Sequence, residues 1–115
     1  MEFSEYHEMH KKMKGYEEQE ILIDMLSEKM GEITGMQAGT LKLFVSQALM
    51  DSLEKRKMPF KKIKYATQEE KTKFVDEIVI NTVKRAKLVA SVDEIIIQCH
   101  KVYEDWKHKY RPEEV

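Results

Sequence analysis

Two histidines near the N-terminus have a spacing that could bind a metal ion. His7 and His10 are three residues apart, which on a helix places both imidazoles at neighbouring positions suited to Zn²⁺ or Ni²⁺. A complete site needs further ligands, and the other nitrogen and sulfur donors, Cys99, His100 and His108, belong to a different predicted helix. Two histidines close to a chain end are more often solvated than bound to a metal. We therefore expect no metal site.

A cysteine beside a histidine is the second candidate for chemistry. Cys99 could act as a nucleophile with His100 as its base, but adjacent residues on a helix point about 100° apart. Cys99 also falls on an apolar stripe, which predicts a buried thiol with a structural role. The chain contains no phosphate-binding loop, nucleophile elbow or zinc-protease motif. We therefore expect no catalytic residue, no cofactor and no enzymatic activity.

Length and composition favour a single helical domain over residues 1–115. Charged residues make up 36% of the chain, with only four glycines and two prolines, as is typical of helical proteins. A single cysteine excludes an internal disulfide and favours a reducing compartment. The N-terminus lacks the features of a secretory signal, and no apolar run approaches the roughly 20 residues that cross a bilayer. We expect a cytoplasmic protein without a membrane partner.

The elements that must position any site include two amphipathic helices between residues 68 and 110. Each opens with a capping box, which begins at Thr67 or Ser91. The joint between the helices is short, so we expect antiparallel or steeply angled neighbours. The first apolar stripe contains Val75, Ile78, Val79, Thr82, Val83, Ala86, Val89 and Ala90. The second contains Val92, Ile95, Ile96, Cys99, Val102, Tyr103, Trp106 and Tyr110.

The N-terminal half of the chain predicts further helices. Residues 4–14 form a short candidate that Gly15 ends, and residues 17–34 form a longer helix with one apolar arc. A third amphipathic helix ends at about Lys57, and residues 58–66 predict a loop or a short extended piece. The predicted fold class is therefore all-α: a compact bundle of four main helices plus a short N-terminal helix.

Several large apolar side chains lie off the predicted core stripes of the third, fourth and fifth helices. Single exposed apolar residues are ordinary in proteins, but five on three helices indicate a second buried surface. That surface is either more core, if one helix is covered on two sides, or an interface with a protein partner or another copy of the chain. These predicted partner-binding residues are Leu43, Met50, Ile80, Leu88 and Ile97.

A basic segment with embedded aromatic residues follows the third predicted helix. Lysines beside an aromatic ring could bind phosphates and stack on an unpaired base. An acidic protein surface would suit the same charges equally. Basic residues at a helix C-terminus are also favoured by the helix dipole alone, so nucleic acid, an acidic partner and no binding role all stay open. The segment consists of Lys55, Arg56, Lys57, Phe60, Lys61, Lys62, Lys64 and Tyr65.

Residues 26–44 can be compared loosely with the helix-turn-helix of DNA-binding proteins. Gly35 takes the place of the turn glycine and Gly31 that of the small residue before it. Gly39 inside the reading helix weakens the comparison, and so do the acidic side chains of the preceding helix, which repel phosphate. The residues that would face the DNA groove are Gln37, Thr40 and Lys42.

The charge distribution favours a binding role for the molecule as a whole. Residues 1–36 contain nine acidic and four basic residues, and residues 37–115 contain twelve acidic and sixteen basic residues. Such polarity favours oriented binding, although helix surfaces also vary in charge by chance. We expect a small non-enzymatic binding or regulatory module that acts through helix faces on a protein partner or by self-association. The alternative is nucleic-acid binding through residues 55–64 or 26–44.

Overall fold

The chain adopts an all-α fold in a computed structural model. The structure describes the backbone of residues 3–63 and 66–110, and the side chains of residues 18–60, 62–63 and 66–108. The helices are α1 (Phe3–Thr34), α2 (Ala38–Arg56), the single-turn α3 (Phe60–Ile63), α4 (Gln68–Ala86) and α5 (Val92–Tyr110). No strand occurs in the described ranges, so the predicted fold class of four main helices is confirmed.

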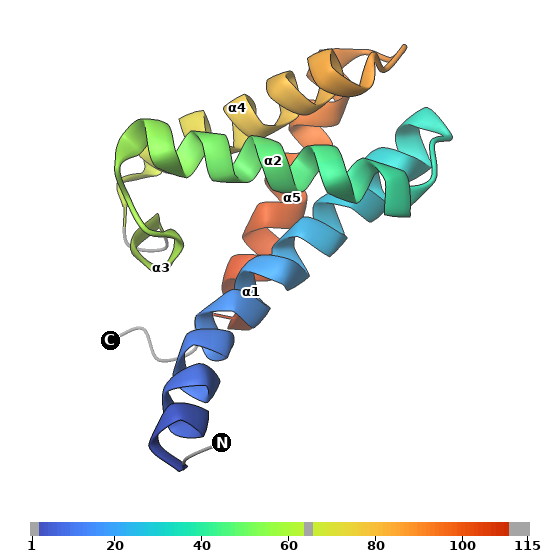
Figure 1. Ribbon diagram of the computed structural model, residues 1–115. Coiled ribbons are helices and arrows are strands. Elements are labelled where there is room, and N and C mark those ends of the chain that lie inside the picture. Colours follow the sequence, from blue (N-terminus) through green and yellow to red (C-terminus); the bar gives the residue numbers. More distant parts are fainter. Residues whose placement is uncertain (1–2, 64–65, 111–115) are drawn as a thin grey trace.

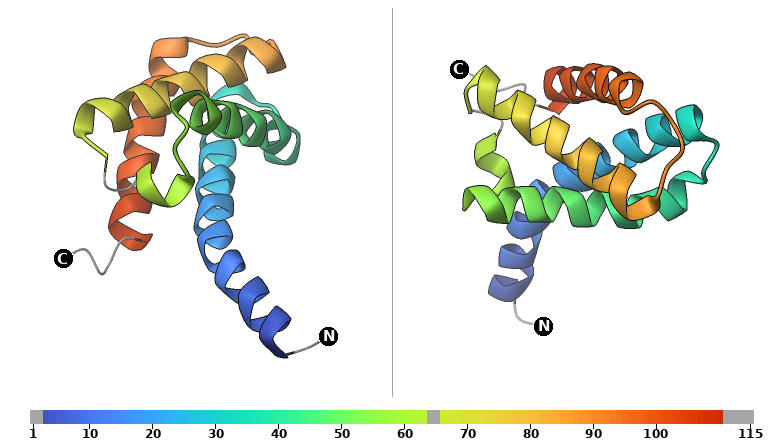
Figure 2. Two further views of the ribbon diagram at one scale, coloured as in Figure 1. Left: turned by 60° about the vertical axis from the view of Figure 1, so that its left-hand side comes forward. Right: turned by 90° about the horizontal axis from the view of Figure 1, so that it is seen from above.

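The four long helices form two antiparallel pairs that cross each other (Figure 1). One pair is α2 with α4, and the other is α1 with α5. The pairs are joined because α1 also packs on α2 and α5 on α4, as the turned views show (Figure 2). The last two helices are thus the steeply angled neighbours that their short joint predicts. The N-terminal part of α1 extends beyond the rest of the molecule (Figure 1). No helix in the described part of the chain is long and apolar enough to cross a membrane.

An aromatic cluster fixes α5 inside this arrangement. The Trp106 side chain is fully buried, and its ring packs on Phe60 at a centroid distance of 5.4 Å and on Tyr103 at 5.5 Å. Its indole N–H donates a 3.0 Å hydrogen bond to the backbone carbonyl of Glu18 in α1. Tyr103 in turn contacts Phe74 of α4 edge to face. One apolar stripe of α5 therefore holds α1, α3 and α4 together.

Side-chain caps determine where α4 and α5 begin. The Thr67 hydroxyl oxygen accepts a hydrogen bond from the Glu70 backbone N–H at 3.2 Å, and the Ser91 hydroxyl oxygen accepts one from the Glu94 N–H at 3.3 Å. Each cap satisfies a backbone donor that the first turn of a helix leaves open. Both predicted helix starts are confirmed.

The predicted end of the fourth helix is wrong, because the apolar stripe does not continue to Ala90. The helix α4 ends at Ala86, where Lys87 takes the left-handed conformation with φ 52°. The Leu88 N–H then donates to the Val83 carbonyl at 3.1 Å, which completes a Schellman motif that stops the helix. As a result the Val89 side chain is 97% exposed instead of buried.

Two boundaries in the first half of the chain need comment. The structure gives Phe3–Thr34 as one helix, and a separate short helix over residues 4–14 with a stop at Gly15 stays a prediction. A glycine inside a helix costs only about 1 kcal/mol and need not end it. In the predicted loop of residues 58–66, the single turn α3 forms, where Pro59 presets the backbone for a helical turn.

Candidate protein-binding surface

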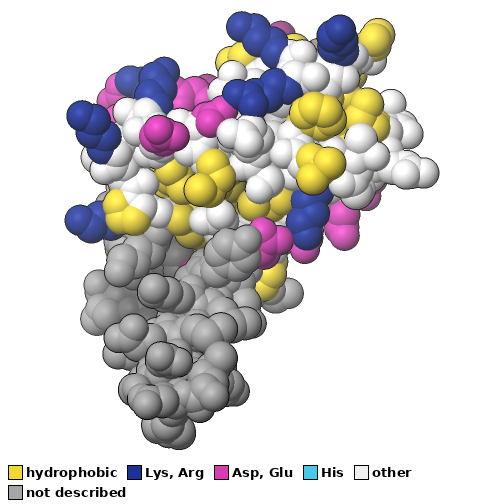
Figure 3. Space-filling model, viewed as in Figure 1, with side chains coloured by type: hydrophobic (Ala, Val, Ile, Leu, Met, Phe, Trp, Pro, Cys, Tyr) yellow, Lys and Arg dark blue, Asp and Glu magenta, His cyan; other side chains and the backbone are white. Residues whose placement is uncertain are grey.

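The outward side of α2 presents large apolar side chains that the core does not cover. The Leu43 side chain is 72% exposed and the Met50 side chain 50%. Gly39, Gln47 and Glu54 are exposed with them, because residues three, four and seven apart share one face of a helix. We call these five residues the α2 face. Figure 3 looks onto α2 and shows hydrophobic side chains interrupting the polar surface there. The opposite side of α2 buries Leu41, Val45, Ala48, Leu49, Ser52 and Leu53.

A groove of about 470 Å³ opens beside Met50 at the C-terminal end of the α2 face. It exists because Lys57, with φ 51°, ends α2 and turns the chain toward α3. Gln19 of α1 also lines it, and the Gln19 amide donates to the Met50 sulfur at 3.6 Å. The lining is mainly apolar, and its methionines have flexible thioethers that adapt to a partner. We call this the α2 groove; it is lined by Gln19, Met50, Leu53, Glu54, Lys57, Met58, Pro59 and Phe60.

The residues predicted to bind a partner are distributed over α2, α4, α5 and the turn between α4 and α5. Leu43 and Met50 share the α2 face. Ile80 is exposed on α4, and Ile97 is exposed on α5, a helix that packs on α1 and α4. Leu88 is half-buried and packs against the core, which favours the alternative that it is part of the core; its contact with a partner stays a prediction. Its burial follows from the Schellman turn, which folds this residue back onto α4.

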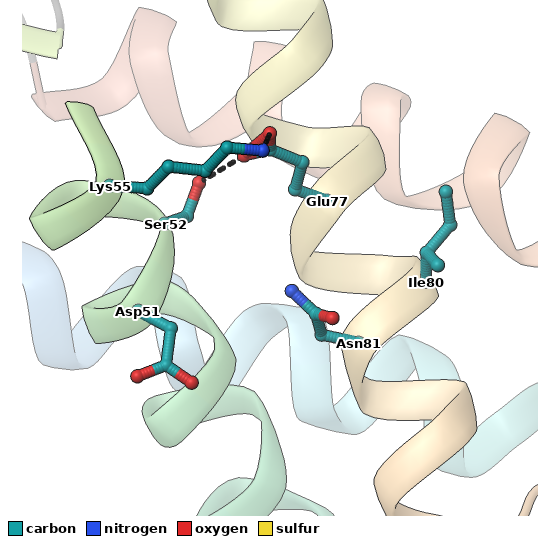
Figure 4. A pocket seen from close by; sticks show the side chains of 6 residues that line it. All are labelled: Asp51, Ser52, Lys55, Glu77, Ile80 and Asn81. Atoms are coloured by element: carbon teal, nitrogen blue, oxygen red, sulfur yellow. Dashed lines mark hydrogen bonds and ion pairs between the residues drawn. The ribbon is translucent and has the colours of Figure 1, made fainter.

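A polar cluster connects α2 to α4. The Ser52 hydroxyl donates to Glu77 Oε2 at 2.8 Å and accepts from Arg56 Nη1 at 2.8 Å. Arg56 also forms ion pairs with Glu77 and with Glu70, the latter at 3.2 Å, and Lys55 reaches Glu77 Oε1 at 3.1 Å. A small pocket of about 220 Å³ adjoins this cluster (Figure 4). Its lining residues are Asp51, Ser52, Lys55, Glu77, Ile80 and Asn81.

The electrostatics of this cluster favour a structural role. Partial burial by itself raises the pKa of Glu77, but hydrogen bonds from Arg56, Ser52 and Lys55 outweigh it and lower the pKa to about 2. A carboxylate with so low a pKa is a weak base at neutral pH, and the Ser52 proton is already donated to it. The arrangement therefore suits holding two helices together better than activating a nucleophile.

Three residues of the basic segment are engaged in the fold. The Phe60 side chain is only 7% exposed and packs on Trp106, so its expected role as a free stacking surface for a base is wrong. Lys55 and Arg56 are paired with acids of α4. Lys57 and Lys62 are exposed. The side chains of Lys61, Lys64 and Tyr65 lie outside the described residues.

The two glycines used in the comparison with the helix-turn-helix have a conformational role at the turn between α1 and α2. Gly35 has a positive φ of 81°, and a Cβ on Gly31 would lie 2.9 Å from a backbone carbonyl of the turn. However, the charge of Lys42 is already paired, because its Nζ lies 2.9 Å from Asp24 and 3.2 Å from Glu20 of α1. The acidic side chains beside the turn disfavour phosphate, and DNA binding stays a prediction.

The remaining candidates for chemistry are separated by the fold. Cys99 is fully buried, and burial raises the pKa of its thiol to about 12, so it is protonated at neutral pH. His100 points instead to Asp76 of α4, with 2.8 Å between Nε2 and Oδ1. His7 and His10 lie outside the described side chains. Among those described, no three histidine, cysteine or acidic residues gather as metal ligands.

Sequence reasoning found Leu43 and Met50 but missed the α2 groove. The groove depends on Gln19 of α1 and on the turn after Lys57, and no local spacing indicates that these segments meet. Comparisons with protein-family models, curated proteins and solved structures found no match. A function for this chain must therefore be inferred from the α2 face and the α2 groove.

Proposed function

We propose that this protein is a non-enzymatic module that binds another protein through the α2 face and the α2 groove. The observation that carries the proposal is the 72% exposure of Leu43 on the same face as a concave apolar groove. Burying apolar surface contributes roughly 25 cal/mol per Å², and interfaces combine such a centre with a polar rim. Here Gln19, Gln47 and Glu54 supply polar groups around the apolar residues.

The shape of the surface indicates how a partner would be held. The α2 groove shares Met50 and Glu54 with the α2 face, so an apolar side chain of a partner that lies on this face can reach the groove beside Met50. Thioether side chains adjust their rotamers to fill irregular space. Glu54 and Lys57 stand at the same groove with opposite charges, and both can pair with polar groups at the rim of the contact. A regulatory role would follow if this contact prevented the bound protein from carrying out its own activity.

Affinity capture with matched variants tests this proposal. The immobilised wild-type chain and the variants Leu43→Lys, Met50→Lys and Ile97→Lys would be exposed to lysate of the source cells. We expect the first two variants to lose a bound protein that the wild type and Ile97→Lys retain. The control suits the comparison because Ile97 is exposed to a similar extent, 53%, on α5. Equal unfolding midpoints would show that all variants are folded, and identical bound proteins for all four chains would contradict the proposal.

Nucleic-acid binding is a weaker second proposal. It is supported by the exposed Lys57 and Lys62 beside the α2 groove. Two observations weigh against it: Arg56 is neutralised by Glu70 and Glu77, and Phe60 is buried. Affinity for a phosphate backbone depends on the number of free cations that reach it. The described part of the segment offers few, so protein binding is favoured.

A further inference from the structure

We propose that the partner at the α2 face is a second copy of this chain, with α2 packed antiparallel against α2 across a two-fold axis. This inference rests on the proposed function and names its partner. A two-fold contact requires a self-complementary surface, in which each residue meets a counterpart at equal distance from the axis. With the axis between Ser46 and Gln47, Leu43 lies opposite Met50 of the second copy, and Gly39 lies opposite its Glu54.

The first element of self-complementarity is a protrusion and a hollow on the same face. Leu43 projects from α2, with 72% of its side chain exposed. The α2 groove begins at Met50, seven residues further along and therefore about 10 Å away along the helix. In an antiparallel pair, Leu43 of each copy enters the groove of the other. The two-fold axis produces this contact twice, which doubles its contribution to the free energy of binding.

The second element is charge complementarity at the two ends of the face. Glu54 lies in the last turns of α2, where the negative end of the helix dipole disfavours a carboxylate. At the other end, Gln37 caps α2 without a side-chain hydrogen bond, and the first turn has no acidic residue. The antiparallel arrangement moves Glu54 of one copy to the positive end of α2 in the other.

Gly39 leaves the space that Glu54 of the second copy needs at the N-terminus of α2. It lies in the first turn of α2 and is exposed, and a Cβ built on it would meet nothing within 4 Å. The absence of a side chain lets a carboxylate come near the open backbone N–H groups of that turn. When the direction of α2 is reversed, Gly39 thus exchanges places with Glu54 and Leu43 with Met50, while Gln47 lies beside the axis.

Sedimentation equilibrium of the full chain gives the first test. We expect a dimer at micromolar concentration, and a dissociation constant at least about tenfold higher for Leu43→Lys and for Met50→Lys. Ile97→Lys, the matched change on α5, should leave the dissociation constant unchanged. Glu54→Gln should raise it about two- to fivefold, whereas Glu28→Gln, an exposed acid on α1, should not.

Cross-linking gives a second test that does not depend on destabilising the contact. A Gln47→Cys variant places thiols of the two copies beside the axis, so a short bismaleimide should join them into a covalent dimer. The native Cys99 is fully buried and would not react in the folded protein. An Ile97→Cys variant is the control and should remain unlinked under the same conditions.

The outcomes separate this inference from the proposed function. A wild-type chain that stays monomeric at millimolar concentration would overturn the inference. So would a dimer that Leu43→Lys leaves intact, or one that cross-links through Ile97→Cys and not through Gln47→Cys. If the monomer still captures another protein through Leu43, the proposed function stands and only the second copy is excluded. If neither self-association nor capture depends on the α2 face, both fail.

Discussion

At the scale of residues, Glu77 carries the charge on which the contact between α2 and α4 depends. Its pKa lies at about 2 in the folded protein, below the reference value of 4.5. A carboxyl whose pKa is lower in the folded than in the unfolded state stabilises the fold above the unfolded value. That contribution is present above about pH 4.5 and is lost as the pH falls toward about 2.

Replacing Glu77 should therefore remove part of the acid sensitivity of the fold. We expect Glu77→Gln to lower the free energy of unfolding by about 2–4 kcal/mol at pH 7, because Arg56 keeps its partly buried charge and loses its main partner. The difference from the wild type should shrink as the pH falls to about 3, measured by urea denaturation. On the same helix, the exposed Glu69→Gln should change stability by less than about 0.5 kcal/mol. A constant difference at all pH values would contradict the assigned role.

Thr82 offers a substitution that should stabilise the protein. Its side chain is fully buried, and in the described part of the chain its hydroxyl has no hydrogen-bond partner. Thr82→Val keeps the shape and removes the unsatisfied group, so the free energy of unfolding should rise by about 1 kcal/mol. Ser27→Ala is the contrast, because the Ser27 hydroxyl donates to the Ile23 carbonyl at 2.7 Å and its loss should destabilise. A less stable Thr82→Val variant would be evidence for a partner of the hydroxyl.

At the scale of elements, α2 and α4 end in the same way. Each terminates at a lysine in the left-handed conformation, Lys57 or Lys87, with φ near 50°. The next N–H in each case bonds back to a carbonyl five residues earlier, which completes a Schellman motif. Lysine pays a steric cost in this conformation that glycine does not. Both helix ends are therefore set by backbone hydrogen bonds despite an unfavourable residue.

A glycine at one of these positions should raise stability. We expect Lys87→Gly to increase the free energy of unfolding by about 1 kcal/mol in thermal or urea denaturation. Lys84→Gly, three residues earlier in the last turn of α4, should lower it by up to about 1 kcal/mol, because glycine is unfavourable at a position with helical backbone angles. If both variants lose stability equally, Lys87 makes contacts that outweigh its backbone strain.

At the scale of the whole molecule, ion pairs engage two of the four cations whose side chains the structure describes in the basic segment. Lys55 and Arg56 face acids of α4, while Lys57 and Lys62 remain exposed. We therefore expect no measurable binding of single- or double-stranded oligonucleotides at about 0.15 M salt, for the wild type or a Lys57→Ala, Lys62→Ala variant. Fluorescence titration at two salt concentrations measures this. Binding that weakens steeply with salt and is lost in the double variant would restore the nucleic-acid proposal.

The sequence by itself determined the helices and most of the buried faces. The caps at Thr67 and Ser91 and the apolar stripes ending at Trp106 depend on residues within one or two helical turns, so local spacing reveals them. The exposure of Leu43 and Met50 followed from the same periodicity. These features could be predicted because neighbours in the sequence determine them.

Only the tertiary structure decided which surface is available for binding. It buried Phe60 against Trp106, paired Arg56 with Glu77, and folded Leu88 back onto the core. It also placed Gln19 of α1 beside Met50 of α2 to form the α2 groove. Each of these contacts except that of Leu88 joins residues that are far apart in the sequence. The position of Leu88 depends on the left-handed conformation of Lys87, which a lysine at that position does not indicate. Side-chain type and spacing do not encode such contacts, because they arise from how the helices cross.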